Sequence, residues 1–532
     1  MTSSLLTPSP PETRPGRRSR RPRGSLTVFA LAVTVYTALG WYLVARLHVV
    51  GFDVLDRLDH ALDLLHAASG ATTFTPDLPP LAVLALGPLV VVPPGEHSLL
   101  VVPVASAACA GVLLVALHAL LRGARVGTAG RVGVLVAAAA NPLLVLGAST
   151  GARSVVWLAM LTLGVVALVA WLTTDRVGYV PLAGVAFAAA VLSSYASLVW
   201  VLVAAALLVT TLRRRGAPSL ELEGTLVAFV APTVLGLALV TLLSALHGSA
   251  PWSWAVETSD AGASVAVSLV DLPARTLGLL IGGAPLALVV LPALLVVAAV
   301  RRDLVSGWLA ALLLTAVVLP AGSAGVGAET TPFALSQALP SLVLALVGAV
   351  WLVGRSERRR TLTLTLLVVV LIASVPWTLR QMAIYPHQGL EARFADAVTT
   401  GRDQQNTLTS SGLVVGVADE QAMAGYIRSH VHTGRSIVTD GRRTFAVELF
   451  TGRPDLFVPV DARTDAIDAA SYVLLSHRMG PDEASARFPD ATSGKDAAWS
   501  VVFATARYTL VRVPATGWPD LMGDSRTEGG RS

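Results

Sequence analysis

The chain has 532 residues, of which 54% are apolar and 14% are charged, and its formal net charge is +5. Several apolar runs reach the roughly 20 residues needed to cross a hydrocarbon core of about 30 Å, which excludes an ordinary water-soluble protein and indicates several membrane spans. The arginines stand in short clusters between apolar runs, so nucleic-acid binding is excluded as the reason for the positive charge.

The amino-terminal segment 1–25 carries six arginines together with proline and glycine, a composition that predicts a disordered basic tail in the cytoplasm. The apolar run that follows, 26–44, is too long for the core of a signal peptide and ends without a small-residue cleavage site. It is therefore predicted to be the first transmembrane helix.

Apolar segments recur up to residue 380, and together with the first run they number eleven. Two of them, 178–195 and 198–212, are short and nearly continuous, so a count that differs by one or two also fits the pattern. The ten segments after the first are 98–121, 132–148, 155–174, 178–195, 198–212, 224–246, 276–300, 304–320, 335–353 and 362–378.

The distribution of arginine predicts the orientation of these spans. With the amino terminus inside, nineteen arginines ahead of residue 380 fall in cytoplasmic segments, and four fall on the other side: Arg46, Arg57, Arg153 and Arg275. This asymmetry follows the positive-inside rule of the plasma membrane. Eleven crossings from a cytoplasmic start place everything after the last span outside the cell.

The segment 381–515 has a different character, because charges return and apolar residues fall into short runs that are typical of strands. These runs are 436–440, 472–476 and a pair within 499–513, while 419–431 has the apolar spacing of a helix. They predict a small α/β domain outside the membrane, and 516–532 is predicted to be a disordered tail.

The predicted fold is therefore a polytopic α-helical membrane protein of about eleven transmembrane helices with a small C-terminal extracytoplasmic α/β domain. Its membrane domain spans 26–380 and includes a first external loop at 46–97.

Charge is concentrated at the start of that loop, in GFDVLDRLDHALDLLH (51–66). On a helix, Asp53, Asp56, Arg57 and His60 share one arc, and the leucines, with one exception, share the opposite arc. The pattern predicts an amphipathic helix at the outer membrane surface with its carboxylates turned toward water.

Two interpretations of this helix stay open. In the first, the charges only stabilise it, with Asp53 as its N-cap and Arg57 paired to Asp53 four residues away. In the second, a carboxylate held just outside the bilayer also accepts a proton from an acceptor hydroxyl.

The pattern formed by Asp53, Leu55, Arg57 and Ala61, followed by PDLPPLAVLALGP (76–88), resembles the first external loop of bacterial, actinobacterial-type GT-C membrane glycosyltransferases. These are relatives of the protein mannosyltransferases and of polyprenyl-phosphate-sugar transferases. NPLLVLGASTG (141–151), GSAPWSW (248–254) and the closing α/β domain are similar in order and place.

The resemblance implies inverting-type transfer of a sugar from a polyprenyl-phosphate donor to a cell-envelope glycan or protein, with Asp53 as the base. Arg57, Asp56, His60 and His97 are the candidates for holding substrate. Trp252 and Trp254 are candidates for stacking on a sugar ring.

Each of these candidates also has a structural interpretation. His97 fits a solvated loop, and the two tryptophans fit the aromatic belt of a membrane interface. His430 and His432 have no further ligands nearby in the sequence, so no metal site and no cofactor are predicted.

The sequence also departs from the family pattern. Ser154 stands where such proteins often have an acidic residue, and Ser194, Tyr195 and Ala196 stand where an Arg-Tyr-Glu-like cluster is common. A non-catalytic envelope scaffold is therefore an alternative to a transferase. A transporter or lipid flippase is a further alternative, which the lack of ionisable residues in the centres of the spans disfavours.

Overall fold

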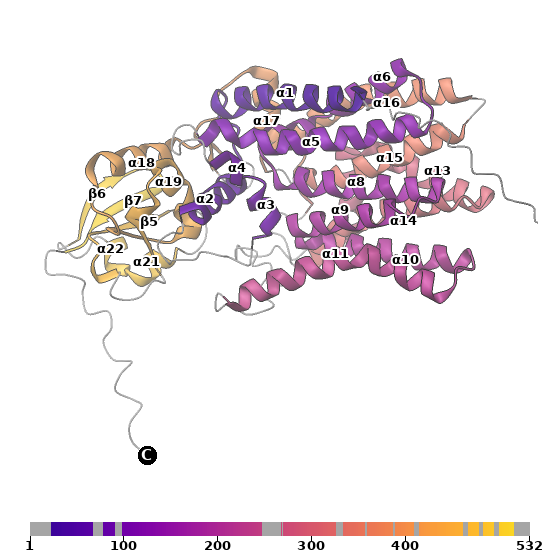
Figure 1. Cartoon of the computed structure of the whole chain (residues 1–532). Helices are drawn as coiled ribbons and strands as arrows, with labels where there is room; N and C mark the ends of the chain where they lie inside the picture. Colours follow the sequence, from indigo (N-terminus) through magenta and orange to yellow (C-terminus); the bar gives the residue numbers. More distant parts are fainter. Residues whose placement is uncertain are drawn as a thin grey trace, which may run out of the picture.

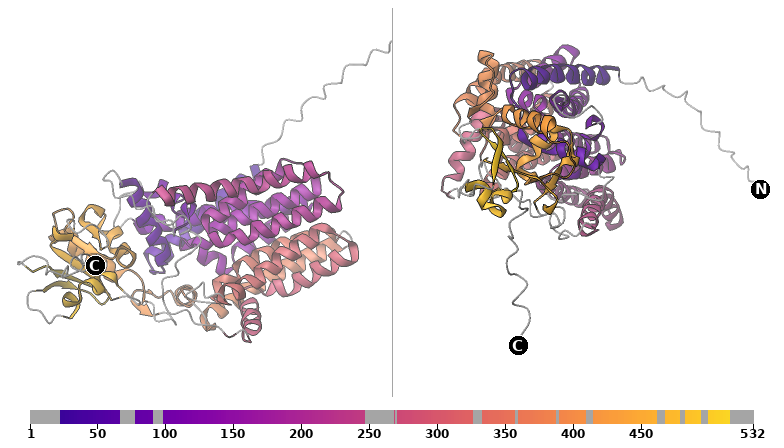
Figure 2. Two further views of the ribbon diagram at one scale, coloured as in Figure 1. Left: turned by 90° about the horizontal axis from the view of Figure 1, so that it is seen from below. Right: turned by 90° about the vertical axis from the view of Figure 1, so that its left-hand side faces the viewer.

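The computed structural model shows a long bundle of helices with a smaller domain of strands and helices at one end (Figure 1). Turned by 90°, the molecule keeps the same arrangement, with the smaller domain capping one end of the bundle (Figure 2). The described residues are 23–66, 78–90, 98–246, 268, 270–325, 333–356, 359–386, 389–408, 414–460, 467–477, 482–493 and 499–514.

The bundle confirms the prediction of a polytopic helical membrane protein. Among the described residues, eight helices are long and apolar enough to cross a membrane, or ten spans if each of two bent helix pairs is one. The remaining predicted span corresponds to a helix of only 15 residues, α9. The helices of the bundle are α1 (Arg23–Ala45), α5 (Ser98–Gly123), α6 (Thr128–Ala139), α7 (Pro142–Ser149), α8 (Arg153–Thr174), α9 (Tyr179–Ser193), α10 (Leu198–Arg214), α11 (Ser219–Leu246), α12 (Leu272–Gly283), α13 (Pro285–Arg301), α14 (Leu304–Gly325), α15 (Leu339–Arg355) and α16 (Arg360–Ile384), with 3₁₀ turns at Tyr195–Ser197 and Leu335–Ala338.

Two segments expected as single spans are bent pairs. α6 and α7 meet at 68°, and α12 and α13 meet at 107°. In each pair the second helix has proline as its first residue, Pro142 or Pro285. Proline has no amide proton and its ring crowds the preceding turn, so the first helix cannot continue and a new one starts at an angle.

The arginine clusters lie at the end of the bundle away from the strands (Figure 1). Gly354 near the end of α15 approaches Ala124, which follows α5. The start of α14 meets the ends of α10 and α15, because Trp308 donates a hydrogen bond to Thr211 at 2.8 Å and Asp303 pairs with Arg355 at 2.9 Å. The cationic loops on which the orientation was predicted therefore share one end of the molecule.

The smaller domain, called the outer domain below because it lies beyond one end of the bundle, is built on a mixed five-stranded sheet in the order β4-β3-β5-β7-β6. β3 runs parallel to β4 and β5, and β7 is antiparallel to β5 and β6. β1 and β2 form a separate two-stranded sheet. The strands are β1 (Thr407–Leu408), β2 (Val414–Val415), β3 (Ile437–Thr439), β4 (Phe457–Pro459), β5 (Tyr472–Ser476), β6 (Ser500–Ala504) and β7 (Tyr508–Arg512).

Both faces of the central strands β3 and β5 are buried, so these strands are nearly continuous apolar runs. Ile437 and Leu474 belong to the core shared with α18 and α19, whereas Val438 and Val473 belong to the core around Phe488. The predicted small α/β domain is thereby confirmed. Its helices are α18 (Ala418–His430), α19 (Gly441–Thr451), α21 (Glu483–Arg487) and α22 (Pro489–Ser493), with a 3₁₀ turn at Pro454–Leu456, and α17 (Glu391–Thr400) links it to α16.

The charged stretch forms α2 (Phe52–His66), as predicted, but its surroundings correct the interpretation. Its apolar arc does not lie on the membrane surface, because it is buried in one core with α19 and with the short helices α3 (Pro80–Leu84) and α4 (Gly87–Val90). Amphipathicity shows that a helix has an apolar face and does not show what covers that face. The buried side chains of this arc are Val54, Leu55, Leu58, Ala61 and Leu62.

Candidate active site between the bundle and the outer domain

Asp53 lies in the first turn of α2, where that helix meets the turn between α7 and α8. Its side chain is 55% exposed, and its Oδ2 atom lies 3.2 Å from Nη2 of Arg57. The same oxygen lies 3.5 Å from the backbone nitrogen of Arg153, the first residue of α8. The predicted pair of Asp53 and Arg57 is therefore present, but Asp53 is not the N-cap, because α2 begins at Phe52, two residues earlier than an N-cap at Asp53 requires.

The turn between α7 and α8 has a shape that its sequence explains. The Asn141 side chain caps α7 by accepting a hydrogen bond from the amide of Leu143 at 3.1 Å. After α7 ends, Gly151 adopts φ +81°, a left-handed conformation that glycine adopts at little steric cost. A Cβ atom there would lie 2.7 Å from Val54 and 2.9 Å from the carbonyl oxygen of Val102. The NPLLVLGASTG segment thus brings backbone into direct contact with α2.

Arg57 links α2 to the turn between α7 and α8. Its Nη2 atom donates to the carbonyl oxygen of Gly151 at 2.7 Å, and its Nε atom donates to the carbonyl oxygen of Asp53 at 3.1 Å. Burial lowers the pKa of the guanidinium, and the neighbouring Asp53 carboxylate opposes that shift. Since Arg57 is buried and makes these contacts inside the protein, it is placed to orient Asp53 rather than to meet a substrate.

The other candidate residues make no described contact with Asp53. His60 contacts Asp56 within α2, with 2.9 Å between its Nδ1 atom and the carbonyl oxygen and 3.4 Å to the carboxylate. Both side chains are partly exposed. His97, Trp252 and Trp254 lie outside the described residues.

Two residues of the site were missed in the sequence. Arg153 counted only as one of the few external arginines, and Gly151 only as part of a resembling segment. The scarcity of arginine on that side of the membrane was the available signal for Arg153. Arg153 and Asp53 are 100 positions apart in the sequence, and only the tertiary structure brings them together.

Positive charge lies beside the Asp53 carboxylate. The Arg57 guanidinium contacts Oδ2 of this carboxylate, and the same oxygen faces the amino-terminal end of α8, where the helix dipole is positive. The hydrogen bonds and ion pairs that Asp53 makes with other described side chains and amides use Oδ2. Its Oδ1 atom takes no part in these contacts.

A cavity of about 300 Å³ lies nearby, at the junction of α1 and α5 with the outer domain. Asp53 is not among the described residues that line it, so it does not hold the carboxylate. No group of three His, Cys, Asp or Glu side chains that suits a metal ion occurs in the described part of the chain. The cavity is lined by Ala45, His48, Leu99, Leu100, Gln421, Arg428 and Phe450.

No protein-family model matches the chain, and no curated protein matches it. Solved structures do. ArnT from Cupriavidus metallidurans bound to undecaprenyl phosphate is 14% identical, with a TM-score of 0.57, 93% of this chain covered and 99% of ArnT covered. The apo form of ArnT is 13% identical, with a TM-score of 0.54 and coverage of 92% and 98%.

The oligosaccharyltransferase from Archaeoglobus fulgidus, in its apo form, is 11% identical, with a TM-score of 0.47, 86% of this chain covered and 70% of that chain covered. The two ArnT matches extend over nearly the whole of both chains, so the likeness includes the bundle and the outer domain together. The resemblance inferred from the sequence is thereby confirmed at the level of the fold: the protein has the GT-C fold of the membrane glycosyltransferases.

Proposed function

We propose that the protein is a membrane glycosyltransferase that moves a sugar from a polyprenyl-phosphate donor to a cell-envelope glycan or protein outside the plasma membrane. The observation that carries the proposal is the half-exposed Asp53 carboxylate, fixed between the bundle and the outer domain by Arg57 and the start of α8. The likeness to ArnT, solved with undecaprenyl phosphate, supports a polyprenyl phosphate as the lipid.

In the proposed reaction an acceptor hydroxyl attacks the anomeric carbon of the sugar while Asp53 takes the hydroxyl proton. The bond between that carbon and the phosphate oxygen breaks, and the polyprenyl phosphate leaves with the bonding electrons. Arg57 keeps the carboxylate aimed. We assign to Arg153, the first residue of α8, the stabilisation of the charge that develops on the leaving phosphate.

The test is sugar transfer by the full-length protein in lipid vesicles, with radiolabelled polyprenyl-phosphate sugars of several kinds and cell-envelope extracts as acceptors. Labelled acceptor and free polyprenyl phosphate should appear together. Absence of both products with every donor, from folded wild-type protein, contradicts the proposal and favours the scaffold.

The scaffold is the second candidate because of the positions that depart from the family pattern. Ser194 and Tyr195 are buried in the bundle, where the resemblance leads one to expect charged neighbours. In a scaffold the outer domain binds a partner, and the bundle anchors it in the lipid bilayer.

The proposed orientation gives a testable topology. The arginine-rich end of the bundle should face the cytoplasm, and the outer domain, at the opposite end, should face outward. A reporter fused near Arg214 should be active only inside the cell, and one fused after residue 532 only outside. The reverse pattern for both fusions, at matched expression, contradicts the orientation and with it a site on the outer face.

A further inference from the structure

A single arginine of the outer domain reaches the first turn of α2. Arg507 stands just before β7 and is only 5% exposed. Its Nε atom lies 3.1 Å from Asp419 and its Nη2 atom 2.8 Å from Glu420, both at the start of α18. Nη1 and Nη2 also donate to the carbonyl oxygen of Gly416 at 3.4 and 3.3 Å. The edges of the guanidinium are thus occupied within the outer domain.

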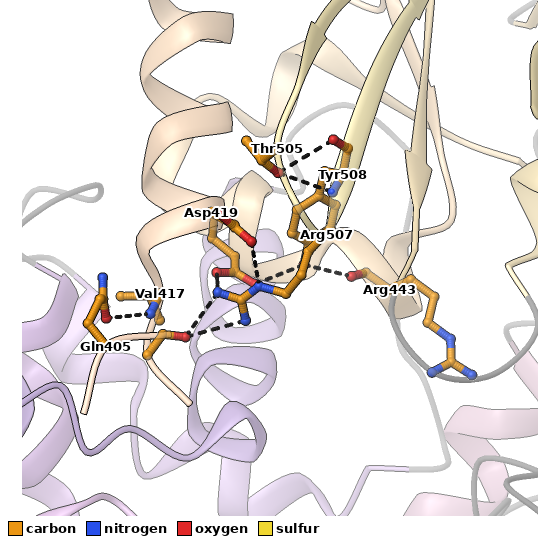
Figure 3. A network of polar contacts seen from close by, with 9 residues as sticks. Gln405, Val417, Asp419, Arg443, Thr505, Arg507 and Tyr508 are labelled. Carbon is orange, nitrogen blue, oxygen red and sulfur yellow. Dashed lines mark hydrogen bonds and ion pairs between the residues drawn. The ribbon is translucent and has the colours of Figure 1, made fainter. Parts of the chain in front are cut away.

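The neighbouring side chains hold this arginine in place. Tyr508 donates from its hydroxyl to Glu420 at 3.1 Å and lies 3.3 Å from the carbonyl oxygen of Arg443 at the start of α19. Figure 3 shows dashed lines from Arg507 to Asp419 and from Tyr508 to Arg443, which join this network to α18 and to α19. A buried guanidinium with this many partners has one orientation.

The guanidinium of Arg507 also lies over an aromatic ring of α2. The central carbon of Arg507 lies 5.7 Å from the ring centroid of Phe52, the first residue of α2, which is a cation–π distance. The ring of Phe445 on α19 meets Phe52 edge-on, with centroids 6.3 Å apart and an angle of 78°. Phe52 is therefore held by the outer domain, and the next residue in the chain is Asp53.

The first turns of α2 are in contact with the bundle on one side and with the outer domain on the other. On the bundle side Arg57 donates to Gly151, and on the other side Phe52 lies against Arg507 and Phe445. Asp53 stands between these contacts. A shift of about 1 Å in a reacting group can reduce a rate by about a hundredfold, so the second contact has consequences for transfer as well as for packing.

We propose that Arg507 is a positioning residue, which acts through Phe52 to set the place of the Asp53 carboxylate relative to α8. The effect on transfer rests on the proposed function, whereas the effect on the order of α2 does not. In this arrangement the outer domain is part of the catalytic apparatus and not only a surface for the acceptor.

Replacing Arg507 itself leaves Asp419 and Glu420 without a buried cation, so the outer domain could unfold. Phe52→Leu avoids this, because it removes the ring, keeps an apolar side chain and leaves every ion pair of Arg507 in place. Phe52→Tyr restores an aromatic face. Arg512→Ala is the control, because Arg512 at the end of β7 also contacts a ring at 5.7 Å, that of Tyr472 on β5.

The first measurement is hydrogen exchange of the backbone amides of α2 in the full-length protein. Phe52→Leu should speed exchange of the amides of residues 56–59, which bond to the carbonyl groups of the first turn, about tenfold or more, while exchange in α18 stays as in wild type. Phe52→Tyr and Arg512→Ala should match wild type throughout. Unchanged exchange in Phe52→Leu overturns the inference.

The second measurement is transfer, with kcat and KM determined separately. Phe52→Leu should lower kcat about tenfold to hundredfold with KM for the acceptor nearly constant, and Phe52→Tyr should restore most of kcat. A rise in KM alone overturns a positioning role. If wild type transfers no sugar but Phe52→Leu speeds exchange in α2, the proposed function fails and the role of Arg507 in ordering α2 is upheld.

Discussion

Asp53→Asn is expected to abolish sugar transfer while the protein stays folded. Asparagine has the same shape, suits the first turn of a helix and can still accept a hydrogen bond from Arg57, but it cannot take a proton from the acceptor. Loss of a general base typically reduces a rate by about 10²–10⁴. The measurement is the initial rate of transfer from a polyprenyl-phosphate donor in vesicles, at equal amounts of folded protein.

Asp175→Asn is the control for this variant. Asp53 reaches the amino-terminal end of α8, and Asp175 follows the carboxy-terminal end of the same helix, where it is exposed and pairs with Arg215 at 2.7 Å. Transfer by Asp175→Asn should stay within about twofold of wild type, because exposed ion pairs contribute little. Asp59, the neighbouring acid on α2, is unsuitable because it is buried. Equal transfer by Asp53→Asn and wild type requires the base to be elsewhere.

Gly151→Ala is expected to destabilise the protein by about 2–4 kcal/mol and to reduce transfer strongly. Alanine is strained at φ +81°, and its methyl group would overlap Val54 of α2 and the backbone oxygen of Val102. The turn must therefore move away from α2, and the carbonyl group that accepts the hydrogen bond of Arg57 moves with it. The midpoint of thermal unfolding in detergent and the rate of transfer measure the two effects.

Gly216→Ala is the control that introduces backbone strain without a steric overlap. Gly216 has φ +69°, but no heavy atom lies within 4 Å of the position of a Cβ atom there. This variant should lose only about 1–2 kcal/mol and keep full transfer. Similar losses of stability and transfer in the two variants would show that the close approach of the turn to α2 has no special importance.

The sequence predicted the elements well because their signals are local. A span is recognised by about 20 consecutive apolar residues, and the strands of the outer domain by short apolar runs between turns. The runs at 472–476 and 419–431 correspond closely to β5 and α18. Even the bend before α7 has a signal, since Asn141 and Pro142 are a cap followed by a helix-starting residue.

The site was predicted only in part because its geometry is not local. The helical angle placed Asp53 and Arg57 on one arc, and they do form a pair. Arg57 is buried because Gly151 approaches α2. Phe52 contacts the outer domain because Arg507, near the other end of the chain, lies over its ring. Helical periodicity contains no information on either approach.

The packing of α2 against α19 also has a consequence for how the protein is made. Nearly 400 residues separate Phe52 from Phe445, so a ribosome working at about 5–20 residues per second completes α19 roughly 20–80 s after α2. Throughout that time the apolar arc of α2 has no protein partner from the outer domain. We expect the nascent helix to rest on the lipid surface until α19, in about the last sixth of the chain, is made and covers it. The interfacial helix indicated by the sequence then describes a stage of biogenesis.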